Sequence, residues 1–197
     1  MDIDQEGEVL GSEAASGGQI ALPSDVLPGL INILPQEHRP FFPGQAIPLV
    51  MDAETWLPTL EAVRHRHQDV VGLIATRTAL TGPPSPEDLF TMGTVCRIHR
   101  VHREDAQLQV LLEGLQRFRV TRWIDEKLPL AVNAKYFPDR GDTRSDEQKA
   151  YAVAILNMIK ELIPLNPLYG EELKVFLARS NPNQPAVLAD FAASLTS

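Results

Sequence analysis

The region from Gly93 to Phe137 constrains the fold most strongly, because it reads as a nearly continuous succession of β-strands. The segments GTVCRIHRVH and LQVLLEG are separated by REDA, which is typical of a hairpin connection. The next segment, LQRFRVTRW, alternates, with Phe118 on one side and Arg117 and Arg119 on the other. LAVNAKYF follows as a further strand. Many short strands in succession predict a small, closed or strongly curved antiparallel sheet.

The residues before this region add two strands, one helix and a third strand. GLINIL and QAIPLVM are short apolar runs bounded by Pro and Gly, and Pro48 marks the second as an edge strand or a bulged one. Residues 53–67 are predicted to form a helix capped by Asp52. DVVGLIAT reads as a buried strand, and TGPPSPEDL as a turn-rich loop. One face of the predicted helix carries Trp56, Leu60, Val63 and His67.

The last part of the chain has a helical pattern. Ser145 and Gln148 have the spacing of a capping box. EELKVFLARS and NQPAVLADFAASLTS predict two further helical segments, and the last pattern runs to the final residue without a glycine cap, which is expected of a truncated helix. The predicted apolar faces consist of Tyr151, Ile155, Met158 and Leu162 in the first helix and of Leu188, Phe191 and Leu195 in the last.

The sequence therefore divides into three parts and belongs to the α+β class. Residues 1–24 are rich in Gly, Ser, Glu and Ala and are expected to be a disordered acidic tail. Residues 25–140 form the β-rich domain, a pseudo-barrel with one internal helix. Residues 143–197 form a helical subdomain that is truncated at its C-terminal end.

Charge and composition narrow the classes of function. The net charge is −8, and six of the 26 acidic residues lie in positions 1–25, so the remainder has 20 acidic against 18 basic residues. This near-neutral body argues against a general nucleic-acid binder, which needs a basic surface. No apolar run approaches the length of a membrane span. The only cysteine is Cys96 and the N-terminus lacks a secretory pattern, so a cytoplasmic location is expected.

The residues give no sign of catalytic or metal chemistry. Nucleotide-binding glycine loops, a nucleophile elbow and the HExxH zinc motif are all missing from the sequence. His65 and His67 would not face each other on a helix, and a solvated helix end explains them better than a metal site. Cys96 lies in an alternating strand, where buried packing is the ordinary role. The sequence thus favours binding over catalysis.

The stretch FFPGQAIPLVM contains the candidate binding residues Phe41, Phe42 and Pro43. Adjacent residues on a strand face opposite ways, so one phenylalanine is expected to point into the core and the other outward. An outward aromatic side chain on an edge segment suits a binder of unfolded polypeptide. The alternative is that both rings are covered by helix 53–67 or by the C-terminal helices.

Two motifs resemble the N-terminal domain of Lon-type ATP-dependent proteases. FFPGQAIPLVM precedes a helix as in that family, and PEDLFTMGTVCRIHRV…LQVLLEGLQRFRV matches its pattern over two strands and a turn. The resemblance covers about residues 27 to 195. Departures occur at LPQEHRP, VMDAE and REDA, and they bear on the subfamily. The matching residues of the second motif are Asp88, Leu89, Gly93, Thr94, Val95, Ile98, Val110, Glu113, Gly114 and Arg117.

The resemblance implies a PUA-like fold and a substrate-recognition and assembly module that binds unfolded or damaged proteins. The family's catalytic Ser–Lys dyad and its ATP and Mg sites would lie in a longer parent protein, a homohexamer, so no cofactor and no catalysis are expected of this chain itself. Neither a membrane nor nucleic acid is expected as a partner. The alternative is a stand-alone PUA-like adaptor that binds a ligand or RNA.

Overall fold

A computed structural model describes residues 27–37, 39–138, 146–162, 164, 174, 177 and 184–194. The expected tail at 1–24, Ser145, Leu195 and most of the segment 171–180 lie outside the described residues. The elements of the described part are β1 (Leu30–Gln36), β2 (Ala46–Asp52), α2 (Ala53–His65), β3 (Val70–Thr76), the short 3-10 helix η1 (Pro86–Asp88), β4 (Leu89–Glu104), β5 (Gln107–Asp125), β6 (Ala131–Phe137), α3 (Asp146–Leu162) and α5 (Pro185–Ser194).

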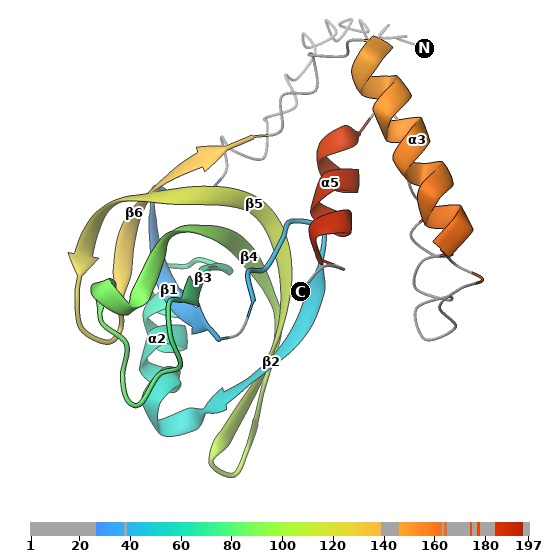
Figure 1. The fold of residues 1–197 in the computed structure, drawn as a ribbon. Coiled ribbons are helices and arrows are strands. Elements are labelled where there is room, and N and C mark those ends of the chain that lie inside the picture. The colour runs from blue at the N-terminus through green and yellow to red at the C-terminus, as the bar shows by residue number, and fades with distance from the viewer. Residues whose placement is uncertain are drawn as a thin grey trace, which may run out of the picture.

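The six strands form one sheet, which closes on itself. Their order is β2-β5-β4-β3-β1-β6, and a further pairing between β5 and β6 makes a barrel of five strands with β2 attached beside it (Figure 1). β5 serves both parts because it has 19 residues. Its first half pairs with β2 and its second half with β6. The predicted α+β fold, a small curved sheet followed by helices, is confirmed.

One pair of strands differs from the antiparallel sheet that was predicted. β1 and β3 run parallel, with Ile33 opposite Gly72 and Leu34 opposite Leu73. Parallel neighbours need a crossover connection, and β2 together with α2 supplies it. Short alternating segments do not reveal such a crossover, so the sheet is mixed.

The predicted break between LQVLLEG and LQRFRVTRW is wrong, because both segments belong to the single strand β5. Gly114 remains within the β4–β5 ladder, opposite Cys96. A register shift lies on each side of this pair, one that leaves Leu115 of β5 unpaired and one that leaves His99 of β4 unpaired, and they allow the long hairpin to bend without ending. The hairpin turn predicted at REDA is confirmed, and Asp105 there has a φ of 50°.

The barrel interior follows the alternation of the strands. Phe118 is fully buried, and its ring meets that of Tyr136 edge to face at a centroid distance of 6.4 Å. The Tyr136 hydroxyl donates to the Pro28 carbonyl oxygen at 2.6 Å, and burial raises the pKa of this phenol to about 12. The barrel core consists of Ile31, Ile33, Val70, Ile74, Leu89, Val95, Phe118, Leu130 and Val132.

Helix α2 packs against the sheet at β1, β2 and β5. Trp56, Leu60 and Val63 are buried along one face, as predicted. The helix ends at His65, two residues earlier than expected, because the chain turns into the left-handed region at His67, where φ is 55°. His67 is therefore exposed and does not belong to the apolar face.

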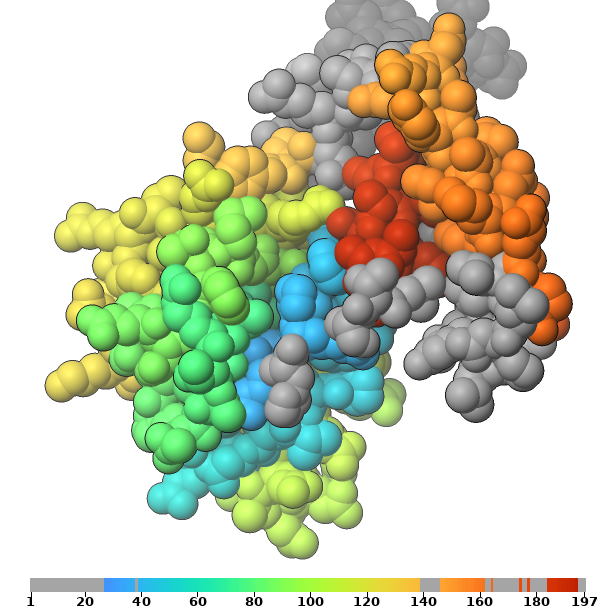
Figure 2. Space-filling model, viewed as in Figure 1, coloured from blue at the N-terminus to red at the C-terminus, as the bar shows by residue number. Residues whose placement is uncertain are grey.

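The C-terminal helices pack on each other. In α3 the buried residues are Ala152, Leu156 and Ile159, and Leu188 of α5 meets them. Of the face predicted for α3, Ile155 packs against this cluster, whereas Tyr151 and Met158 are wrong, since they are 63% and 55% exposed. A pattern based on large apolar side chains does not identify this face, because one of its buried residues is the small Ala152. The space-filling view shows α5 between the barrel and α3 (Figure 2). Among the described helices, none combines the length and apolarity needed to cross a membrane.

Replacing Phe118 tests the barrel core. We expect Phe118→Ala to lower the free energy of unfolding by about 3–5 kcal/mol, because the ring fills the centre of the closed barrel. Urea denaturation followed by far-UV circular dichroism measures the change. Ile124→Ala is the control, since Ile124 lies on the same strand with 43% of its surface exposed. Equal losses in the two variants would contradict this assignment of the core.

Candidate functional site

The segment from Phe41 to Gln45 crosses the middle of β5 at Gly114. The Gly114 N–H donates to the Gln45 carbonyl oxygen and the Gly44 N–H donates to the Gly114 carbonyl oxygen, each at 2.8 Å. A Cβ atom on residue 114 would lie 2.6 Å from the Phe42 carbonyl oxygen. Glycine at this position therefore permits the close approach of the two backbones.

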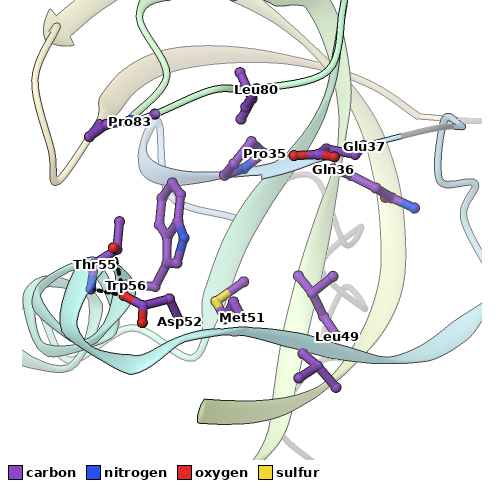
Figure 3. A pocket seen from close by; sticks show the side chains of 12 residues that line it. Pro35, Gln36, Glu37, Leu49, Met51, Asp52, Thr55, Trp56, Leu80 and Pro83 are labelled. Atoms are coloured by element: carbon purple, nitrogen blue, oxygen red, sulfur yellow. Dashed lines mark hydrogen bonds between the residues drawn. The ribbon is translucent and has the colours of Figure 1, made fainter. Parts of the chain in front are cut away.

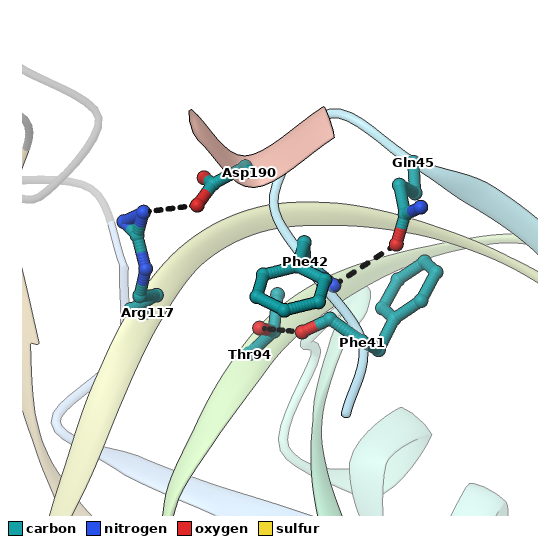
Figure 4. Close-up of polar contacts among 6 residues, drawn as sticks. All are labelled: Phe41, Phe42, Gln45, Thr94, Arg117 and Asp190. Carbon is teal, nitrogen blue, oxygen red and sulfur yellow. Dashed lines mark hydrogen bonds and ion pairs between the residues drawn. The ribbon is translucent and has the colours of Figure 1, made fainter. Parts of the chain in front are cut away.

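Side-chain hydrogen bonds fix the shape of this turn (Figure 4). The Thr94 hydroxyl donates to the Phe41 carbonyl oxygen at 2.5 Å, and the Phe42 N–H donates to Oε1 of Gln45 at 3.1 Å. Gly44 has a φ of 78°, in the left-handed region that glycine adopts without strain. The backbone is thus fixed at both phenylalanines.

The two rings differ in exposure. Phe41 is only 8% exposed and packs in the core cluster that includes Leu34 and Trp56. Phe42 and Pro43 are half-buried. Phe41 is therefore the inward residue of the pair, which the sequence alone left open. Binding of substrate by Phe41, Phe42 and Pro43 stays a prediction, and only Phe42 and Pro43 offer surface to a partner in this geometry.

Helix α5 lies beside this turn, as both Figure 1 and Figure 4 show. Asp190 of α5 forms an ion pair with Arg117 of β5. The Asp190 side chain is 8% exposed and that of Arg117 is 31% exposed, so the pair is largely removed from water. The ion pair fixes α5 to the barrel three residues beyond Gly114.

A separate pocket of about 620 Å³ opens between β1, β2, α2 and the loop that follows β3. Figure 3 shows Leu49 and Met51 rising into it from β2, and the Trp56 ring extending from α2 toward Pro35. Its volume is within the range of ligand pockets in proteins. The lining consists of Pro35, Gln36, Glu37, Leu49, Val50, Met51, Asp52, Thr55, Trp56, Leu80, Gly82 and Pro83.

A few polar groups interrupt this apolar lining. The Thr55 hydroxyl and N–H donate to Oδ2 of Asp52 at 2.6 and 2.7 Å, and they lower the pKa of that carboxyl below its ordinary value. Asp52 is therefore ionised at neutral pH. Oε1 of Gln36 is buried, and within the described part of the chain no donor reaches it. Glu37 adds a second carboxylate to the lining.

One edge of β2 has no neighbouring strand in the described sheet. Ala53 donates its N–H to the Ala106 carbonyl oxygen of the hairpin, and Pro48 has no N–H to donate. In an antiparallel pair, alternate residues direct their backbone groups toward the partner. The odd-numbered residues of β2 thus pair with β5, so Val50 directs its N–H and C=O groups, and Asp52 its N–H, to the open edge. The predicted edge strand is confirmed.

The cysteine and the two histidines of the sequence motifs form no reactive centre among the described residues. Cys96 is fully buried, as predicted, and burial raises the pKa of its thiol, which holds it in the unreactive protonated form. His65 and His67 are exposed. The described residues contain no group of three or more His, Cys, Asp or Glu side chains arranged to hold a metal ion.

Sequence reasoning missed the pocket because its lining comes from three separate stretches of the chain, residues 35–37, 49–56 and 80–83. Pro48 indicated that β2 was an edge strand, but it could not show that β1 and the loop at Leu80 and Pro83 enclose a space beside it. The sequence feature that could have indicated the pocket is an edge strand followed directly by a helix that carries Trp56.

The sequence model of one family, described as the ATP-dependent protease La (LON) substrate-binding domain, matches residues 31–197. Lon protease 2 of Hydrogenovibrio crunogenus is 37% identical over 178 residues, which are 90% of this chain and 20% of that protein. Lon protease of Protochlamydia amoebophila is 38% identical over 173 residues, which are 86% of this chain and 21% of that protein. The chain thus spans about a fifth of the length of these curated relatives.

A solved structure supports the fold. The N-terminal domain of Mycobacterium avium complex Lon protease superposes with a TM-score of 0.61 at 16% sequence identity. The match covers 85% of this chain and 83% of the other. At this identity the likeness concerns the arrangement of strands and helices.

Two substitutions separate the roles of the aromatic pair. Phe41→Ala should lower the free energy of unfolding by about 3–5 kcal/mol, because it leaves a cavity beside Trp56. Phe42→Ala should cost clearly less, since its ring is only half-buried. Urea denaturation of both variants checks this order, and the reverse order would show that Phe42 is the core residue.

Asp190→Ala tests the attachment of α5. Losing the ion pair leaves Arg117 without this partner, so backbone amides in α5 should exchange with deuterium several-fold faster, while amides of β3 and β4 keep their protection. Hydrogen exchange with mass spectrometry gives the readout. Asp146→Ala is the control, because its pair with Lys149 is exposed at 3.7 Å. Unchanged exchange in α5 would mean that other contacts hold the helix.

Proposed function

This chain belongs to the family of substrate-binding domains of ATP-dependent Lon proteases, and we propose that it recognises unfolded or damaged polypeptides for a Lon-like protease. In this role it selects segments with exposed apolar side chains and helps to organise a homohexameric ring. Its work is protein quality control, and its compartment is the cytoplasm.

The observation that carries this proposal is the open apolar pocket beside β2. Folded proteins bury most of their large apolar side chains, whereas unfolded chains expose them. A pocket lined by Leu49, Met51 and Trp56 offers such side chains a place out of water. Val50 beside it is 54% exposed, and Phe42 with Pro43 adds a second apolar surface near α5.

The size of these surfaces implies weak binding by a single copy. Burying one aromatic or aliphatic anchor stabilises a complex by roughly 1–3 kcal/mol. A dissociation constant of about 10 μM or weaker follows for one domain. Several copies in a ring would hold a long chain more tightly through avidity.

The chemistry of degradation belongs to the longer protein that this proposal implies. The chain spans about a fifth of its curated relatives, which are Lon proteases. We assign the ATP and Mg sites and the serine nucleophile to the remainder of such a protein. The chain itself then binds substrate and has neither peptidase nor ATPase activity.

A second candidate is a PUA-like adaptor that binds RNA. The guanidinium of Arg77 lies 4.8 Å from the centroid of the Phe90 ring, and that of Arg119 lies 5.6 Å from the centroid of the Phe137 ring. Exposed aromatic rings next to cations are typical of surfaces that stack bases. The net charge of −8 disfavours this role.

Binding of a permanently unfolded protein tests the proposal. Reduced, carboxymethylated α-lactalbumin with a fluorescent label should gain anisotropy when the chain is added, with half-saturation at about 10 μM or above. Folded α-lactalbumin with its disulfides intact is the control and should show no gain. Since apolar contacts supply most of the affinity, raising the salt concentration should weaken this binding far less than it weakens a nucleic-acid complex.

Two outcomes would redirect the assignment. No gain in anisotropy at several hundred micromolar chain would contradict recognition of unfolded protein. Tight binding of single-stranded RNA that weakens steeply with salt would favour the adaptor, because counterion release governs such complexes.

A further inference from the structure

We propose that the open edge of β2 is a strand-addition site, which takes an extended apolar segment flanked by Lys or Arg as an extra strand beside Val50. This inference rests on the proposed function and specifies how the substrate backbone is held. Three features of the described residues carry it: the free backbone groups, the pocket beside them and the charge of its lining.

The backbone of β2 is prepared for an added strand. Val50 directs its N–H and C=O groups, and Asp52 its N–H, away from β5, and no strand of the described sheet pairs with them. The Asp52 carbonyl belongs to the first turn of α2, since Asp52 is the N-cap of that helix. Only an extended polypeptide matches this spacing of donors and acceptors. A helical or folded segment has its backbone groups already paired, so the edge selects unfolded chains.

Pro48 defines where the added strand can pair. It removes one donor from the first part of the edge, and proline at an edge strand hinders pairing with other sheets. The usable edge is therefore the part from Leu49 to Asp52, which is also the part of β2 that lines the pocket. Four strand residues extend over about 13 Å, so they can pair with a segment of about four residues.

The pocket beside this edge accepts the side chains of such a segment. Leu49 and Met51 point into it and Trp56 forms one wall (Figure 3). Alternate side chains of an added strand face the same way, so every second apolar residue of the segment would enter the pocket.

The negative charge of the pocket lining favours Lys or Arg at the two ends of the bound segment. Asp52 and Glu37 both line the pocket, and the lining contains no Lys or Arg. The lowered pKa of Asp52 keeps its carboxylate charged. Cations at the ends of the bound segment therefore suit this site. The chain's own N-terminal segment suits it poorly, because residues 1–25 contain six acidic and no basic residues.

The probe for this site is the capped hexapeptide Lys-Val-Leu-Val-Leu-Lys, and the readout is the fluorescence of Trp56. Trp123→Phe removes the other tryptophan, which lies at the barrel core, so the emission reports the pocket alone. Peptide binding should shift this emission. The same peptide with Glu in place of both Lys residues should bind several-fold more weakly.

A matched pair of variants tests the backbone contact. Val50→Pro removes the N–H that faces the open edge, whereas Val50→Ala keeps it and removes side-chain surface. We expect Val50→Pro to weaken peptide binding about 10-fold and Val50→Ala by less than about threefold. Urea denaturation of both variants verifies the fold.

Two N-methylated peptides test the same contact without changing the protein. Methyl groups on alternate backbone nitrogens block one edge of the peptide strand, so one isomer should lose binding and the other should keep it. Equal binding of both isomers, or equal affinity of Val50→Pro and Val50→Ala, overturns strand addition.

Failure of strand addition can be distinguished from failure of the proposed recognition of unfolded protein. If Val50→Pro still binds carboxymethylated α-lactalbumin as the unaltered chain does, strand addition is wrong and recognition of unfolded protein stands. If the unaltered chain binds neither the protein nor the peptide, both proposals fail.

Discussion

The pairing requirements of β5 organise the whole structure. A buried strand must satisfy its backbone N–H and C=O groups on both edges, and β5 has 19 residues to satisfy. β4 pairs along one edge, while the other edge is divided between β2 and β6. This division lets β5 close the barrel through β6 and also hold the edge strand β2 outside the barrel. Gly114 stands at the division, and the absence of its side chain allows the chain at Phe42 to pass over it.

Both candidate surfaces follow from that arrangement. The Phe42–Pro43 turn is where the chain passes over β5 before β2 begins, and the pocket is where β2 continues without a strand on its far side. Trp56 connects them, because it belongs to the same core cluster as Phe41 and also lines the pocket. A rigid core thus supports an open surface, so little conformational entropy is lost from the protein when a ligand binds.

The sequence predicts what depends on local pattern and misses what depends on distant contacts. Alternation around Phe118 and the proline at Pro48 identified a buried strand position and an edge strand, because both effects act within a few residues. The parallel pairing of β1 and β3 needs knowledge of a crossover. The α3 face was misjudged since the small Ala152 lies in the contact with α5. The turn that carries the two phenylalanines lies against Gly114, some seventy residues further along the chain, so no local pattern shows which ring points inward.

The closure of the barrel has a consequence for the order in which the chain can fold. β1 pairs with β6, which brings Leu30 opposite Asn133. During synthesis from the N-terminus, β1 must wait for β3 before it has any partner, and the ring cannot close until β6 has emerged. Contacts between residues about a hundred positions apart carry a large loop-closure entropy before they stabilise anything. A domain with this topology belongs among the slower-folding small proteins, and its apolar strands stay open to other chains for longer than those of a helical bundle.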